Sequence, residues 1–79
     1  MPRRSTQDKA LGEALRGLRD RQGLTQEALA SRAGITTGTY ARLELGQSDP
    51  SWSTLRAVAK ALGVTLSQLA RAVEAHEKG

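Results

Sequence analysis

A chain of 79 residues with no cysteine, a net charge of +4 and a pI near 10.4 excludes several classes of protein. The length suffices for one domain with a modest core, but not for a core together with a deep catalytic cavity. Without cysteine there is neither a disulfide framework nor a thiolate zinc site. No apolar run reaches the roughly 18 residues of a membrane span, and no signal-peptide h-region follows Met1. We therefore expect a cytoplasmic protein whose basic charge suits a polyanionic partner such as nucleic acid.

Glycines and hydroxyl residues divide the chain into helical segments. Each of four glycines ends an amphipathic stretch, as expected of C-terminal helix caps: Gly23, Gly34, Gly46 and Gly63. Each of four hydroxyl residues can cap the helix that follows: Thr25, Thr36, Ser51 and Thr65. The expected helices span residues 8–22, 25–33, 36–45, 52–62 and 66–77. Since no alternating strand pattern appears, we predict an all-α fold, with one domain over 8–77 and a flexible basic arm over 1–7.

Apolar residues recur at helical spacing along these segments. Leu11, Leu15 and Leu18 line one face of the first expected helix. Trp52, at the start of the fourth, is expected to plug the core. The core of the second and third helices and the turn between them is expected to consist of Leu29, Ala30, Gly34, Ile35, Tyr40 and Leu43.

The turn at Gly34 is short, because Thr36 caps another helix only two residues later. Two helices joined by a short glycine turn and crossing steeply are typical of a helix-turn-helix. Ala30 is small enough to let the two helices approach closely. Such a turn projects the N-terminal end of the third helix out of the body, where it suits a DNA major groove about 12 Å wide. An ordinary helical hairpin is the alternative interpretation.

Two stretches resemble the Cro and phage-repressor (XRE-type) helix-turn-helix family: LRGLRDRQGLTQEALASRAGITTGTYARLELG and DPSWSTLRAVAKALGV. The resemblance covers roughly residues 9–73. It implies a compact five-helix, lambda-repressor-like domain that acts as a dimer on a near-palindromic operator. The implied function is a transcriptional regulator, in particular a repressor, that binds double-stranded DNA in a bacterial or phage-type cytoplasm.

The resemblance assigns base reading to the exposed positions of the third expected helix. Thr37, Gly38 and Arg42 match the family's main base-reading sites, and Ala41 lies beside them. Arg42 is the strongest candidate, because a guanidinium can grip guanine O6 and N7 bidentately. A phosphate clamp is its alternative role.

Other residues are expected to contact the DNA backbone, some through the same resemblance and some through their own position and charge. Gln26 matches a family glutamine that fastens the domain to a phosphate, and its place in a first helical turn suits an anion. The residues expected to contact phosphates are Arg19, Arg21, Gln26, Thr36, Thr39, Gln47 and Ser48. Arg19 and Glu44 also match a family ion pair that bridges the first helix to the end of the third.

Some departures from the family pattern keep alternatives open. The side chains of Thr37, Gly38 and Ala41 are smaller than those common in the family, and Leu45 stands where a polar or basic residue is usual. Sequence reading would then rest on methyl contacts and DNA shape. One alternative is a protein-interaction module with the same fold and weak DNA reading. Another is the antitoxin or restriction-modification controller type of DNA-binding regulator.

Catalysis is not indicated by any cluster of residues. The single histidine, His76, lies near the C-terminus without a partner cluster, and a solvated helix face explains Glu74 and Glu77. We expect no enzyme activity, no cofactor, no metal, no small-molecule ligand and no membrane partner.

A homodimer is expected, because one domain of this size presents only one reading helix. The expected interface is the fifth helix with the loop before it. Its candidate contacts are Ala70, Ala72 and the Leu62–Val64 edge, since Leu66, Leu69 and Val73 are needed to cover the core.

Overall fold

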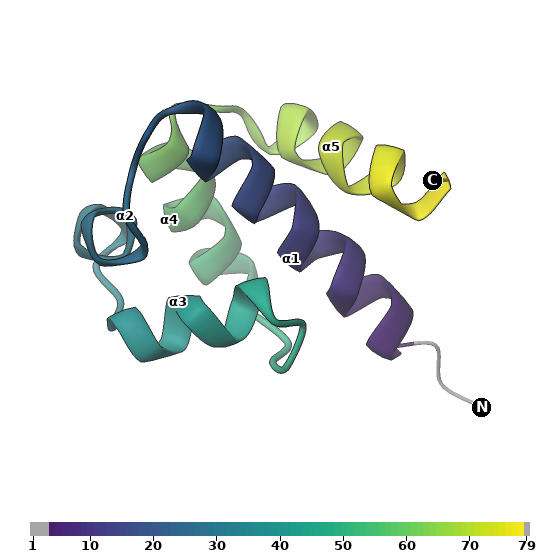
Figure 1. Cartoon of the computed structure of the whole chain (residues 1–79), viewed down its shortest axis with the longest axis horizontal. Helices are drawn as coiled ribbons and strands as arrows, with labels where there is room; N and C mark the ends of the chain where they lie inside the picture. Colours follow the sequence, from purple (N-terminus) through teal and green to yellow (C-terminus); the bar gives the residue numbers. More distant parts are fainter. Residues whose placement is uncertain (1–3, 79) are drawn as a thin grey trace.

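Helix boundaries in the computed structural model fall at the capping residues. The structure describes the backbone of residues 4–78 and the side chains of residues 9–77. Its helices are, in chain order, α1 (Arg4–Arg21), α2 (Gln26–Ala33), α3 (Thr37–Glu44), α4 (Trp52–Leu62) and α5 (Leu66–Lys78). Within this part of the chain every regular element is a helix (Figure 1), which confirms the predicted all-α, five-helix fold.

The N-caps shorten α2 and α3 by one residue relative to the prediction. Thr25 and Thr36 have extended backbones, and their side chains accept hydrogen bonds from the backbone N–H groups of Ala28 and Thr39. They therefore precede the helices rather than begin them. At its other end α3 stops at Glu44, with Leu45 as its C-cap.

The turn between α2 and α3 is built on Gly34. Its φ of +76° lies in the left-handed region that favours glycine. The N–H of Ile35 donates to the Ala30 carbonyl at 3.0 Å, and the N–H of Gly34 donates to the Ser31 carbonyl at 3.2 Å. These bonds satisfy the last carbonyls of α2 and turn the chain directly into α3.

The first helix begins earlier than predicted. The backbone is helical from Arg4, so residues 4–7 of the expected arm continue α1. No glycine or proline stands between Pro2 and Gly12 to interrupt helical geometry there. Residues 1–3 of the expected arm lie outside the described residues.

The core lies where all five helices meet. Helix α1 packs against α5 and α3, while α2 packs against α4 and α3. In Figure 1, α3 lies along the lower edge of the molecule and no helix covers its outer side. The central buried residues are Leu15, Leu29, Ala30, Tyr40, Leu43, Val58, Ala59, Leu62 and Leu69. Of the residues predicted for the helix-turn-helix core, only Ile35, which is half-buried, and Gly34, which is exposed, lie outside this set.

The prediction that Trp52 plugs the core is wrong. Its side chain is 63% exposed. Trp52 lies one turn before Leu55 on the apolar stripe of α4, but α1 and α5 do not cover its side chain. They leave an apolar groove of about 390 Å³, lined by Leu11, Trp52, Leu55, Leu66, Leu69, Ala70, Val73 and Glu74.

Candidate nucleic-acid interface

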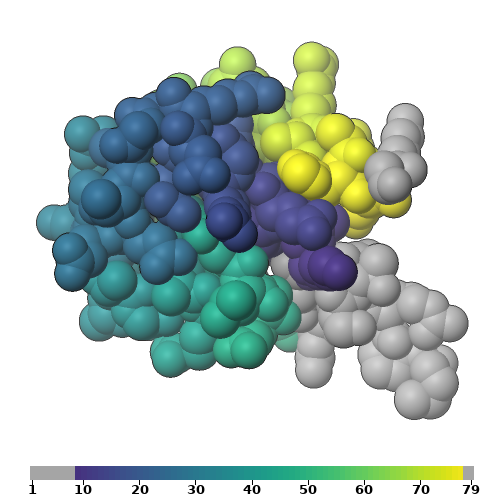
Figure 2. Space-filling view, in the orientation of Figure 1, coloured from purple at the N-terminus to yellow at the C-terminus, as the bar shows by residue number. Residues whose placement is uncertain are grey.

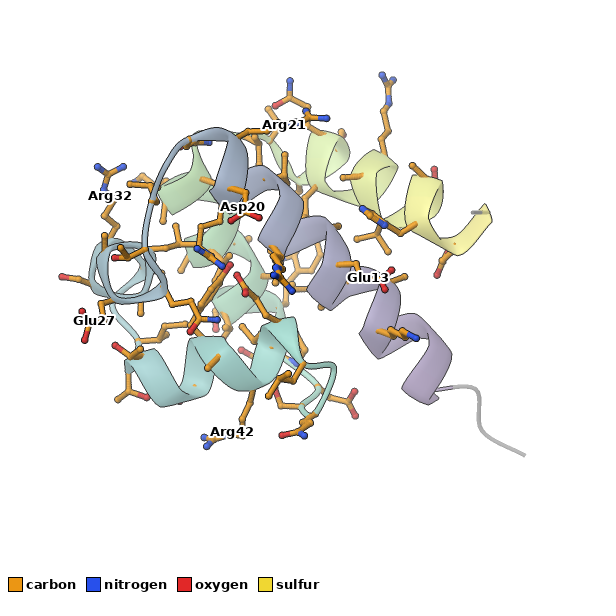
Figure 3. The ribbon with its side chains drawn as sticks, viewed as in Figure 1. Glu13, Asp20, Arg21, Glu27, Arg32 and Arg42 are labelled. Atoms are coloured by element: carbon orange, nitrogen blue, oxygen red, sulfur yellow. The ribbon has the colours of Figure 1, made fainter. Side chains whose placement is uncertain are left out.

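The outer face of α3 carries the residues assigned to base reading. Thr37, Gly38 and Arg42 are exposed and Ala41 is half-buried. With 3.6 residues per turn these four positions share one side of the helix. Figure 3 shows the Arg42 side chain pointing away from the body of the molecule. A partner can therefore approach this face without displacing any other helix.

Arg42 and Gly38 are neighbours on that face. A Cβ atom at Gly38 would meet only Nη1 of Arg42, at 4.0 Å, which is ordinary van der Waals contact. The guanidinium therefore lies one turn back along α3, beside the glycine. Packing within the described chain does not require a glycine at this position.

The first turn of α3 contains two linked hydroxyl groups. The Thr36 hydroxyl oxygen accepts from the Thr39 N–H at 3.0 Å, and the hydroxyl donates to Thr39 Oγ1 at 2.8 Å. The hydroxyl proton of Thr36 is therefore engaged within the helix cap. The Thr39 hydroxyl keeps its own proton and, of the two, is the better donor toward a phosphate.

On its inner face α3 is joined to α1 by a partly buried ion pair. Arg19 Nε donates to Glu44 Oε2 at 2.7 Å, and Arg19 Nη2 donates to Glu44 Oε1 at 3.2 Å. The two side chains are only 14% and 6% exposed. Arg19 Nη1 donates to the Leu24 carbonyl at 2.8 Å, and Gln26 Nε2 donates to Glu44 Oε1 at 2.9 Å. We call Arg19, Gln26 and Glu44 the junction, because they connect α1, α2 and α3.

Charges within the junction stabilise one another. The hydrogen bond to Glu44 raises the pKa of Arg19 above its ordinary value. Burial alone would raise the pKa of Glu44, but hydrogen bonds from Arg19 and Gln26 outweigh it and keep that pKa below its ordinary value. Burial, with the nearby Glu44 carboxylate, raises the pKa of the Tyr40 phenol. The junction is therefore ionised at neutral pH.

The link from Gln26 to Glu44 was missed by sequence reasoning. Nothing local connects two residues 18 positions apart on different helices. The Gln26 amide retains a second N–H and its carbonyl oxygen for an outside partner. Arg19 already has three nitrogens engaged within the chain. For both residues the phosphate contact stays a prediction.

The other residues assigned to phosphates, Gln47, Ser48 and Arg21, fall into two separate places. Gln47 and Ser48 lie in the loop after α3, beyond Leu45 and Gly46, with Gln47 exposed and Ser48 half-buried. Arg21, in contrast, lies at the opposite end of the view from Arg42 in Figure 3. The structure does not bring Arg21 to the α3 face.

Neither a metal site nor a membrane span is found in the part of the chain that the structure describes. No group of three or more His, Cys, Asp or Glu side chains there is placed to hold an ion. None of the described helices is long and apolar enough to cross a membrane.

A short helix, a left-handed glycine turn and a second helix with an open outer face define a helix-turn-helix. In Figure 2, α2 and α3 form one continuous surface at the left of the molecule. The family model described as "Helix-turn-helix domain" matches residues 10–73. The chain belongs to this family, of the Cro and phage-repressor type, as its sequence motifs predicted.

Similar proteins include regulators from phage and bacteria. The immunity repressor protein of Bacillus phage phi105 is 37% identical over 59 residues, which are 75% of this chain and 41% of that protein. The crystal structure of the clp gene regulator ClgR from Corynebacterium glutamicum has a TM-score of 0.87 at 29% identity, covering 91% of this chain and 77% of that one. The restriction-modification controller protein C.AhdI from Aeromonas hydrophila has a TM-score of 0.77 at 32% identity, covering 78% and 94%. The chain spans about half the length of several of the curated relatives that it matches.

Proposed function

We propose that this chain is the sequence-specific, double-stranded DNA-binding unit of a transcriptional regulator, acting as a repressor. The observation that carries the proposal is the contrast between the two faces of α3. Its inner face is fixed to α1 through Glu44, while its outer face, with Arg42, projects into solvent. A rigidly held helix with a free polar face is the arrangement that a major groove accepts.

In this proposal the outer face reads bases and its surroundings hold phosphates. Arg42 reaches guanine, and the smaller Thr37, Gly38 and Ala41 contact methyl groups or allow the helix close approach. Thr39 and Gln26 each keep a donor for a phosphate, as described above. Gln47 and Ser48, next to the C-terminal end of α3, extend the phosphate contacts.

The proposed active species is a homodimer on a near-palindromic operator. One module of this size buries only about 600–1,000 Å² on DNA, so useful specificity requires two half-sites about 34 Å apart. On α5 the exposed Ala70 and half-buried Ala72 remain candidates for the contact. Leu62 does not, because it is 1% exposed and belongs to the core. The exposed ring of Trp52, beside the groove at α5, adds an apolar contact that favours a second copy of the chain.

We further infer a non-catalytic protein of the bacterial or phage cytoplasm. The similarity to proteins named as regulators supports this. A restriction-modification controller is a second candidate, because the likeness to C.AhdI covers 94% of that chain. Genes for a methyltransferase and an endonuclease beside this one would favour the controller.

Selection of bound duplexes from a random-sequence pool tests the proposal. We expect an enriched motif with two-fold symmetry. We also expect log affinity to fall linearly with log salt, at about −0.9 per neutralised phosphate. If no motif is enriched and binding does not depend on salt, the proposal is wrong and the chain is a protein-interaction module instead.

Dimerisation is tested separately by sedimentation with and without the enriched duplex. We expect a weak dimer that DNA strengthens, with a change in the fluorescence of Trp52, the one tryptophan of the chain. A strict stoichiometry of one chain per duplex would contradict the dimer.

A further inference from the structure

Helices α1 and α3 touch backbone to backbone at Gly12. A Cβ atom at this position would lie 2.2 Å from the carbonyl oxygen of Glu44 and 2.8 Å from that of Leu43. Favourable contacts between carbon and other heavy atoms begin at about 3.5 Å. Because the opposing atoms belong to the backbone, no change of side-chain rotamer relieves the overlap. Any side chain at Gly12 must move one helix relative to the other.

Gly17 provides the internal comparison on the same helix. A Cβ atom there would meet nothing within 4 Å. A glycine in a helix interior lowers the stability of the helix relative to alanine. Packing explains the glycine at position 12 and does not explain the one at position 17.

The contact at Gly12 and the junction act on the same residue of α3. Gly12 and Arg19 are seven positions apart, so they lie on one face of α1, two turns from each other. Glu44 contacts this face twice, with its backbone at Gly12 and its side chain at Arg19. Two contacts along one face fix both the distance and the direction of the C-terminal end of α3.

We propose that Gly12 is a positioning residue for DNA reading: its missing side chain sets the place of α3 against α1, and thereby the reach of Arg42. The inference rests on the proposed function. A methyl group at position 12 pushes the end of α3 outward by about 1 Å, the difference between the overlap and a normal contact. Arg42 lies two residues before that end and moves with it. Bidentate hydrogen bonds tolerate little displacement, so base discrimination suffers more than phosphate binding.

The test compares Gly12→Ala with Gly17→Ala, the same change on the same helix in open space. The first readout is the ratio of affinities for a duplex enriched by the wild-type chain and a mixed-sequence duplex of equal length. We expect Gly12→Ala to lower this ratio by at least about fivefold, the lower end of the value of one base contact. Gly17→Ala should stay within about twofold of wild type.

The second readout needs no DNA and reports the junction directly. The Arg19 Nε proton, held against Glu44, should give a slowly exchanging NMR signal in the wild-type chain and in Gly17→Ala. In Gly12→Ala the chemical shift of that signal should change. A fold merely weakened in stability would exchange this proton faster through unfolding, but it would change neither its chemical shift nor the affinity ratio of the folded molecules.

The outcomes separate this inference from the proposed function. If Gly12→Ala leaves either the ratio or the Arg19 signal unchanged, the inference is wrong. If the wild-type chain prefers no duplex, the proposed function fails, and the Arg19 signal alone decides whether Gly12 places α3. Should Gly12→Ala not fold, the double variant Gly12→Ala/Gly17→Ala, which gains helix propensity at both sites, takes its place. A double variant that is also unfolded overturns the inference, because Gly12 would then serve the fold itself.

Discussion

The inner and outer faces of α3 differ in almost every physical respect, although the helix has only eight residues. On the inner face, Tyr40 and Leu43 are fully buried and Glu44 is held by Arg19 and Gln26. On the outer face, Arg42 is exposed and points away from the molecule. The fold therefore depends on one face of α3 and leaves the other available.

This division shows why changes on the two faces should be separable. Substitutions on the inner face should affect stability first and DNA binding as a consequence. Substitutions on the outer face should affect DNA binding without a loss of stability, since additivity holds for sites without shared partners.

The largest effect is expected at the junction. Glu44→Ala leaves Arg19, only 14% exposed, with just the exposed carboxylate of Asp20 at 3.6 Å, and should lower the free energy of unfolding by about 3–5 kcal/mol. Glu74→Ala, which removes an exposed carboxylate on α5, serves as the control and should stay within about 0.5 kcal/mol. Urea unfolding measures both. Equal effects from the two variants would mean that the junction does not hold α3.

Adjacent residues on opposite faces give the next comparison. Leu43 is 2% exposed, and Leu43→Ala should cost about 2–5 kcal/mol of stability through the cavity it leaves. Arg42→Ala, one residue earlier, should change stability by less than about 0.5 kcal/mol. Thermal melts of the two variants suffice. A large loss of stability in Arg42→Ala would contradict the division into two faces.

Acid should weaken the inner face. The pKa of Glu44 is lower in the folded chain than its ordinary value of 4.5, so its contribution to stability is fully present above that pH. The contribution is lost as the pH falls through the lower, folded value. The hydrogen bond to Glu44 raises the pKa of Arg19 above its ordinary value, so Arg19 stays charged throughout this range. Melts between pH 7 and 3 should show a steeper acid loss in wild type than in Glu44→Gln. Parallel curves would speak against an ionised junction.

The smallest effect is expected at Gly38. Since a Cβ atom there meets only the flexible end of Arg42, Gly38→Ala should raise stability by up to about 1 kcal/mol through helix propensity. A loss of DNA affinity despite this gain would show that the partner needs the space. Gly17→Ala, on α1, is the matched control for propensity alone. A destabilised Gly38→Ala would mean that the outer face is packed after all.

The parts of this fold that the sequence could predict are the local ones. Thr25, Thr36 and Gly34 act on backbone groups within a few residues, so their spacing alone places the ends of α2 and α3. Thr65, predicted to cap α5, forms a capping box with Gln68: each accepts from the other's N–H, Thr65 at 3.0 Å and Gln68 at 2.8 Å.

The features that the sequence did not predict depend on how segments distant in the chain pack together. Trp52 has the spacing of a core residue, yet its exposure is decided by where α1 and α5 lie. The roles of Gly12 and Gln26 likewise depend on the approach of α3, which no short pattern contains. Arg19 and Glu44 were paired through the family resemblance rather than through any local signal.

In the proposed function, the outer face of α3 reads base sequence in duplex DNA. The most direct measurement compares the motifs selected from one random-duplex pool by wild type, Arg42→Ala and Gln26→Ala. We predict that Arg42→Ala loses preference at one position per half-site, at a cost of about 1–3 kcal/mol. Gln26→Ala should keep the motif and bind every duplex more weakly. An unchanged motif in Arg42→Ala, with uniformly weaker binding, would contradict it and place Arg42 among the phosphate contacts.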